Sequence, residues 1–136
     1  TILRAGEAAG ITGVIMDSQT ADIYNPKVIR STMGAVFRVP FVYVEDLKAA
    51  LLQLKDHGVH LYAAHLKGQN SYDQEDYTES TGFLIGNEAQ GLSDEIASLA
   101  DTYVKIPMAG SVESLNAAIA SSVLMFEVAR QRRNQK

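Results

Sequence analysis

Short apolar runs alternate with helix-favouring segments along the whole chain. Compact apolar runs between turn residues predict strands, and these runs cover residues 13–16, 41–44, 59–63, 82–86 and 103–106. Capping residues and apolar residues at helical spacing predict helices over residues 1–9, 26–32, 45–55, a short stretch from Ser93, and 113–132. This alternation predicts an α/β fold with a mainly parallel sheet and helices on both faces.

The last predicted helix, over residues 113–132, has two neighbouring apolar stripes. They consist of Leu115, Ile119, Val123 and Phe126, and of Ala120, Leu124 and Val128. An apolar face this wide suggests burial on more than one side, so we expect a partner subunit to cover part of the helix.

Residues 67–80 form a polar run with four acidic side chains, which predicts a long loop. Loops of this length in compact domains are often functional lids or disordered segments.

Composition excludes several classes of protein. The chain has 136 residues, which suits one domain with a single core. Its net charge of −4 argues against a generally basic nucleic-acid-binding surface, but basic side chains gather near the C-terminus and can form a local one. There is no cysteine, which excludes disulfides, a thiolate nucleophile and a cysteine zinc site. Neither a membrane span nor a signal peptide is visible. The absence of cysteine leads us to expect a cytoplasmic protein.

Two strands lead into loops of small and polar residues, 86–93 and 107–116. Ligands in open α/β sheets bind at the carboxyl ends of strands, so these loops predict a binding edge; the alternative is that the first is only a tight turn. The first loop has Walker A spacing, but Leu92 stands where the phosphate-binding lysine belongs, which argues against hydrolysis of nucleotide triphosphates. Ser114 and Asn116, at the predicted helix start, either orient a polar substrate or cap the helix.

Two other chemistries find no support. His57, His60 and His65 fit no standard metal-ligand spacing, so no metal site is expected. Ser114 has no accompanying histidine–acid pair in the pattern, so a hydrolase triad is not expected either.

The two loops together carry a family resemblance. L-I-G-N-E-A-Q-G-L-S (residues 84–93) and I-P-M-A-G-S-V-E-S-L-N (residues 106–116) closely resemble the second and third motifs of the SpoU, or TrmH-like, RNA 2′-O-ribose methyltransferases. T-I-L-R-A-G-E-A-A-G (residues 1–10) is similar to the end of the first motif, N-x-G-x-x-x-R, with Arg4 on its arginine. Residues 31–35 are similar to the family's S-x-G-A segment.

The resemblance implies a fold, a cofactor and an assembly. The fold is an α/β knot, in which the C-terminal segment threads through a loop to form a deep trefoil. The cofactor is S-adenosylmethionine, held by backbone groups of the second and third motifs. These motifs place Gly86, Ile106 and Leu115 at the adenosine, with Leu84 and Met108 lining the pocket. The family is homodimeric through the last helix, and its active site takes residues from both subunits.

The resemblance also implies methyl transfer to a ribose 2′-hydroxyl of structured RNA, with ribosomal RNA favoured over transfer RNA by the third motif. The catalytic residues carried over are Arg4, Glu88, Ser114 and Asn116. An arginine side chain stays protonated at ordinary pH, so Arg4 is poorly suited to act as a general base. We prefer the role of a clamp that binds the neighbouring phosphate and stabilises the developing alkoxide.

Residues 1–136 then constitute a SpoU-type catalytic domain that lacks the first-motif asparagine and glycine and an N-terminal RNA-binding domain. We expect this chain to bind cofactor and to methylate RNA weakly or not at all. Two alternatives remain: a non-catalytic knotted module that binds RNA or a partner, and a doubly wound binding domain of the flavodoxin-like kind. The pattern names neither the RNA nor the nucleotide.

Overall fold

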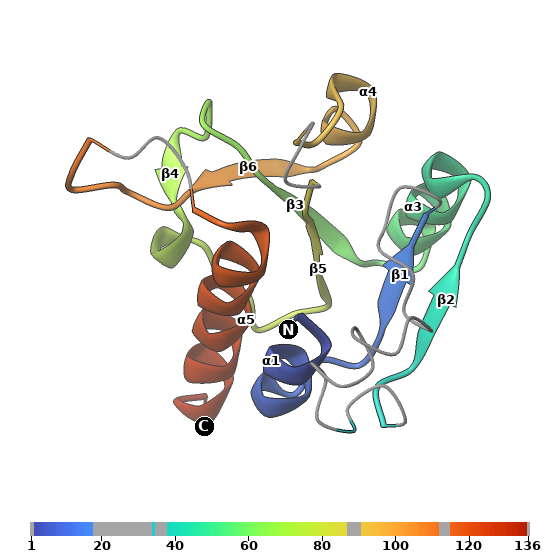
Figure 1. Cartoon of the computed structure of the whole chain (residues 1–136), viewed down its shortest axis with the longest axis horizontal. Helices are drawn as coiled ribbons and strands as arrows, with labels where there is room; N and C mark the ends of the chain where they lie inside the picture. The colour runs from blue at the N-terminus through green and yellow to red at the C-terminus, as the bar shows by residue number, and fades with distance from the viewer. Residues whose placement is uncertain (1, 18–33, 35–37, 87–90, 112–114, 136) are drawn as a thin grey trace.

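Parallel strands form two sheets in the structure, a computed structural model that describes residues 2–17, 34, 38–86, 91–111 and 115–135. The smaller sheet pairs β1 (Val14–Met16) with β2 (Phe41–Tyr43). The larger sheet has the order β4-β6-β3-β5, and all its pairings are parallel (Figure 1). Its strands are β3 (His60–Ala64), β4 (Asn70–Ser71), β5 (Thr81–Leu84) and β6 (Thr102–Lys105). The predicted α/β fold with parallel strands is therefore confirmed.

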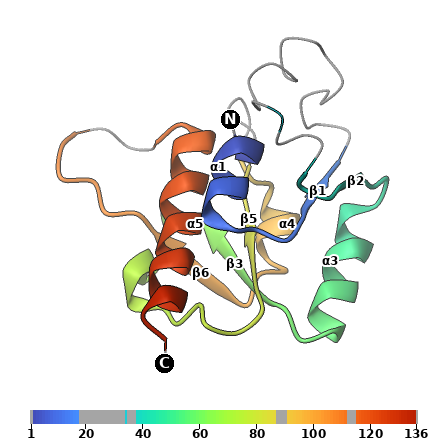
Figure 2. The same ribbon diagram turned by 90° about the horizontal axis from the view of Figure 1, so that it is seen from below.

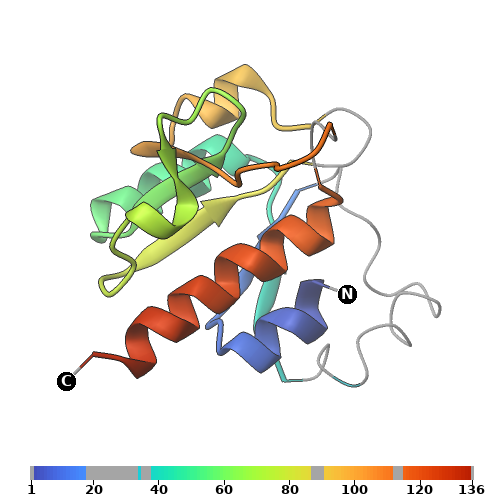
Figure 3. The same ribbon diagram turned by 90° about the vertical axis from the view of Figure 1, so that its left-hand side faces the viewer.

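Helices cover both faces of the larger sheet (Figure 2). The described helices are α1 (Ile2–Ala9), α3 (Leu47–Asp56), α4 (Asp94–Ala97) and α5 (Ala117–Arg133). Successive side chains of β3 point to opposite faces of the sheet, as the two-residue period of a strand requires. Leu61 packs with residues of α3 and α4, whereas Tyr62 packs with Leu124 of α5. Helices α1 and α5 contact each other and lie side by side (Figure 3).

Two predicted helix starts are corrected by their caps. Helix α3 begins at Leu47 rather than at residue 45, because the Asp46 side chain accepts a hydrogen bond from the Ala49 N–H and so serves as the N-cap. Helix α5 begins at Ala117 rather than at residue 113, because Asn116 is its N-cap. The helix predicted over residues 26–32 lies outside the described residues.

The predicted long loop over residues 67–80 contains short regular elements, which corrects the prediction of a loop throughout. It contains strand β4 and a 3₁₀ turn, η2 (Tyr72–Gln74). Tyr77 is fully buried, with its ring edge-on to Tyr62 and Phe83 at centroid distances of 5.0 and 5.3 Å. This burial also raises the pKa of the Tyr77 hydroxyl. An aromatic anchor therefore fixes a segment whose composition is mostly polar.

Side chains near the end of α5 form hydrogen bonds with residues 75–79 of the same segment. The Gln131 side chain accepts a hydrogen bond from the Tyr77 N–H at 2.7 Å and donates one to the Glu75 carbonyl at 2.8 Å. Arg132 donates to the carbonyls of Tyr77 and Glu79. Part of the basic cluster near the C-terminus therefore has a structural role.

The two apolar stripes of α5 have different surroundings. Leu124 and Val128 lie in the core below the sheet. Ile119 and Phe126 remain 54% and 45% exposed. In the described part of the chain, no helix has the length and apolar character to cross a bilayer.

Candidate functional site

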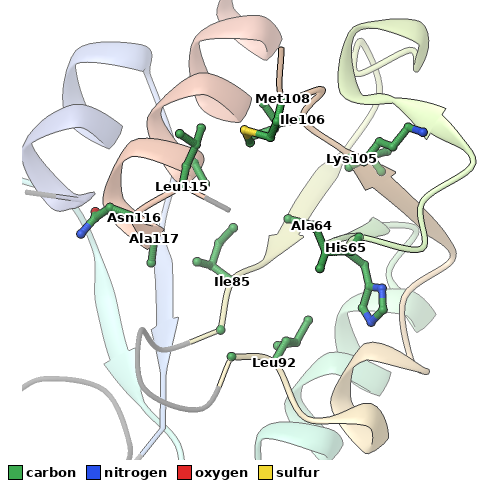
Figure 4. A pocket seen from close by; sticks show the side chains of 15 residues that line it. Ala64, His65, Ile85, Leu92, Lys105, Ile106, Met108, Leu115, Asn116 and Ala117 are labelled. Carbon is green, nitrogen blue, oxygen red and sulfur yellow. The ribbon is translucent and has the colours of Figure 1, made fainter. Parts of the chain in front are cut away.

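A pocket of about 460 Å³ opens at the carboxyl edge of the larger sheet (Figure 4). Three parallel strands end there, and each continues into a segment that lines the pocket. The lining residues are Ala64, His65, Leu66, Ile85, Gly86, Gly91, Leu92, Val104, Lys105, Ile106, Met108, Leu115, Asn116, Ala117 and Ala120. The volume lies in the range of small-molecule sites, which is about 300–1,000 Å³.

At Gly86 the backbone lies in close contact with the backbone of Gly91 and Leu92. A Cβ added at Gly86 would lie 2.2 Å from the Gly91 carbonyl carbon and 2.2 Å from the Leu92 nitrogen. The chain leaving β5 therefore passes against the backbone of a later segment with no space for a side chain. Only glycine fits this crossing, because backbone atoms cannot rotate out of the way as a flexible side chain can.

The opposite wall is the start of α5. The Asn116 side-chain oxygen accepts hydrogen bonds from the Ala118 and Ile119 N–H groups at 2.8 and 3.3 Å. Figure 4 shows Leu115 and Met108 in the same pocket, with Asn116 on the side opposite Lys105. An apolar cavity bordered by strand ends and a helix start can hold a ligand that has both a flat apolar part and hydrogen-bonding groups.

The structure brings together most of the cofactor-binding residues predicted from the sequence and one predicted catalytic residue, Asn116. Gly86, Ile106, Met108, Leu115 and Asn116 all line the pocket. Their assignment to a cofactor or to catalysis stays a prediction.

The other predicted site residues lie elsewhere. Leu84 is 7% exposed and packs in the core with Leu51 and Leu61, away from the pocket lining. Arg4 is exposed on α1 and does not line this pocket. Glu88 and Ser114 lie outside the described residues.

A third wall was not predicted. Ala64, His65 and Leu66 follow the central strand β3 and line the pocket. The available signal was indirect: in a parallel sheet, residues that follow a strand between two site-bearing strands reach the same edge.

The described lining of the pocket carries little charge. Among its described lining residues, Lys105 carries the one full charge. Within the described ranges, no three histidine, aspartate or glutamate side chains gather closely enough to hold a metal ion. His60 instead bonds the Thr102 hydroxyl at 2.8 Å, and His57 bonds the Gln53 carbonyl at 2.8 Å.

Comparisons with known proteins agree with this geometry. Residues 1–126 match the model of the SpoU rRNA methylase family. A Staphylococcus aureus protein named as a TrmH-family tRNA/rRNA methyltransferase is 35% identical over 132 residues. The alignment covers 97% of this chain and 53% of that protein, so the chain spans about half the length of the relative.

Two solved structures are similar along nearly the whole chain. The SpoU methyltransferase AviRb from Streptomyces viridochromogenes, in complex with AdoMet, has a TM-score of 0.88 and 36% identity, over 99% of this chain and 53% of that one. The TrmH/SpoU tRNA-modifying enzyme of A. aeolicus has a TM-score of 0.85 and 30% identity, over 97% of this chain and 67% of that one.

Proposed function

Because the chain belongs to the SpoU rRNA methylase family, we propose that it transfers a methyl group from S-adenosylmethionine to a ribose 2′-hydroxyl of a structured RNA. Ribosomal RNA is the favoured substrate, since residues 106–116 closely match the family's third motif and the matching model is that of the SpoU rRNA methylase family. The observation that carries the proposal is the pocket at the carboxyl edge of the sheet, which unites both later motifs. Its similarity to an AdoMet-bound structure supports the cofactor.

The residues present fit this cofactor. Ile85, Ile106 and Leu115 offer apolar surfaces for a flat base, and the chain at Gly86 presents backbone without an intervening side chain. S-adenosylmethionine supplies a methyl group on a positively charged sulfur, so the protein needs no metal ion to activate the donor. The protein's share of the work is to orient the ribose and to stabilise charge on its 2′-oxygen.

We assign the work on the RNA to four residues. Arg4 clamps a neighbouring phosphate through its planar pair of donors and stabilises the developing alkoxide. Glu88, Ser114 and Asn116 orient the hydroxyl. Support comes from the motif match and, for Asn116, from its place in the pocket.

The same resemblance supports a trefoil knot, in which the C-terminal segment threads through a loop. Structural similarity to SpoU methyltransferases over nearly the whole chain supports this arrangement. True knots are rare, so the motif match carries this proposal more than the strand pattern does.

Asn116 variants test the function, because the side-chain oxygen caps α5 and the amide N–H group is the donor that we assign to the substrate. In the full-length protein, Asn116→Asp keeps an oxygen for the Ala118 and Ile119 N–H groups but loses the amide N–H donor. We expect the helix cap to be retained and methylation to fall by about tenfold or more. Asn116→Ala should lose activity and also about 1 kcal/mol of stability, the usual value of an N-cap.

The measurement is transfer of labelled methyl groups to ribosomal RNA, followed by alkaline digestion. Ribose methylation leaves labelled dinucleotides that resist alkali, because a methylated 2′-oxygen cannot attack the adjacent phosphate. Label in alkali-sensitive nucleotides would refute ribose specificity. Full methylation by Asn116→Ala would show that the site is wrongly assigned and would favour a non-catalytic role for this pocket.

We also propose a homodimer through α5, because Ile119 and Phe126 form an exposed apolar ridge seven residues apart on the same helix side. Phe126→Asp should shift the protein from dimer to monomer in sedimentation, since it places a charge in a buried apolar interface. Leu52→Asp on α3 is the matched control, because Leu52 is 44% exposed and lies on a different helix. If Phe126→Asp and Leu52→Asp both remain dimeric in sedimentation, the interface lies elsewhere.

A further inference from the structure

The third wall of the pocket is a tight turn, residues 64–68, that hydrogen bonds tie to β6. The His65 N–H donates to the Val104 carbonyl at 2.9 Å, and the Gly68 N–H donates back to the His65 carbonyl at 3.0 Å. A Cβ at Gly68 would lie 2.7 Å from the Val104 carbonyl carbon, so the turn sits directly against the β6 backbone. Leu66, at the middle of the turn, is 74% exposed beside the pocket.

The His65 imidazole makes the remaining hydrogen bond of this turn. Its Nδ1 accepts a hydrogen bond from the Lys67 N–H at 3.0 Å. A ring nitrogen that accepts carries no proton, so the neutral ring holds its proton on Nε2. The His65 side chain and the two backbone bonds therefore hold the chain on both sides of Leu66.

The ring is itself anchored to the core. It stacks on Tyr103 with centroids 4.9 Å apart and planes inclined by 22°. Tyr103 packs against the apolar cluster that contains Leu51 and Leu61. Stacking fixes the ring plane and thus the direction of Nδ1, which links the position of the pocket wall to the rigid core.

We propose that His65 is a positioning residue for the cofactor: through Nδ1 it holds the turn over residues 64–68 in the conformation that forms the third wall of the pocket. This inference rests on the proposed function only for the identity of the ligand. It requires no contact between the imidazole and the cofactor. His65 acts on the ligand through the backbone of Leu66 and Lys67.

The test compares His65→Ala with His65→Asn. The Asn side-chain oxygen is attached to Cγ, as Nδ1 is in histidine, so it can accept the same bond from the Lys67 N–H. His57→Ala is the matched control, because His57 bonds a carbonyl at the end of α3, away from the pocket. The readouts are hydrogen exchange of the Lys67 amide in the free protein and calorimetric affinity for S-adenosylhomocysteine.

We expect His65→Ala to speed hydrogen exchange of the Lys67 amide. The affinity for S-adenosylhomocysteine should fall about fivefold to tenfold, which corresponds to the free energy of one hydrogen bond. His65→Asn should restore both to within about twofold, and His57→Ala should change neither. The nitrogen NMR spectrum of the wild-type ring should show Nδ1 unprotonated.

Unchanged Lys67 exchange in His65→Ala would overturn the inference, because the ring would then not hold the turn. Faster exchange with unchanged affinity would also overturn it, because the turn would then not position the ligand. Wild-type protein that binds neither S-adenosylmethionine nor its product overturns the proposed function instead, and the exchange result still decides whether His65 holds the turn.

Discussion

Gly86→Val is expected to weaken binding of S-adenosylmethionine and S-adenosylhomocysteine by about 100-fold or more. Even its Cβ would lie 2.2 Å from the Gly91 carbonyl carbon, and the branched side chain adds two more atoms at the same crossing. The chain after β5 must then separate from residues 91–92, which form the adjacent part of the pocket. Overpacking of this kind costs about 1–3 kcal/mol or more, and each 1.4 kcal/mol taken from binding is tenfold in affinity.

Calorimetric titration measures this effect, and Gly110→Val is the matched control. Among the described residues, no atom lies within 4 Å of a Cβ added at Gly110, so we expect the same substitution to be tolerated there. We expect one site per chain in the wild type and in Gly110→Val. A Gly86→Val protein that unfolds at the wild-type temperature and binds normally would show that the cofactor lies elsewhere.

Arg4→Ala is expected to lower the methylation rate of the full-length protein by about 100-fold to 1,000-fold, the usual loss when one donor to a developing oxyanion is removed. Cofactor affinity should stay unchanged, because Arg4 does not line the pocket. Arg4→Lys should recover little activity, since a lysine cannot make the paired contacts of a guanidinium. Near-normal activity of Arg4→Lys would exclude the two-point clamp.

Mixed dimers decide which subunit Arg4 serves. A dimer of one Arg4→Ala and one Gly86→Val subunit has one site with an intact pocket, which can receive Arg4 from the other subunit. If the active site takes residues from both subunits, mixing two inactive variants should restore about a quarter of full activity, because half of the dimers are mixed and each has one competent site. Verified mixed dimers without activity would indicate that Arg4 does not serve the partner's pocket.

Local sequence patterns predicted most described strands and helices, because each element carries its own apolar periodicity. The segment over residues 67–80 was harder to predict, since what orders it is distant in sequence. Its anchor, Tyr77, is one aromatic residue among acids, and Gln131 reaches it from 54 residues away. No local window contains that interaction.

The parts of the candidate site that come from continuous sequence motifs could be predicted. Residues 84–93 and 106–116 both reach the pocket, where glycine and a helix start are recognisable in the sequence. The turn over residues 64–68 was missed because its place depends on β3 lying between β5 and β6. Strand order arises from long-range pairing, which apolar periodicity does not specify.

The bonds from α5 to residues 75–79 also bear on how the protein emerges from the ribosome. Gln131 lies 54 residues after Tyr77, and at about 5–20 residues per second this stretch takes roughly 3–11 s to synthesise. Through that interval the aromatic cluster of Tyr62, Tyr77 and Phe83 lacks the cover that Leu124 provides in the finished fold. The nascent chain is therefore expected to leave these aromatic side chains exposed for seconds, until α5 packs against them.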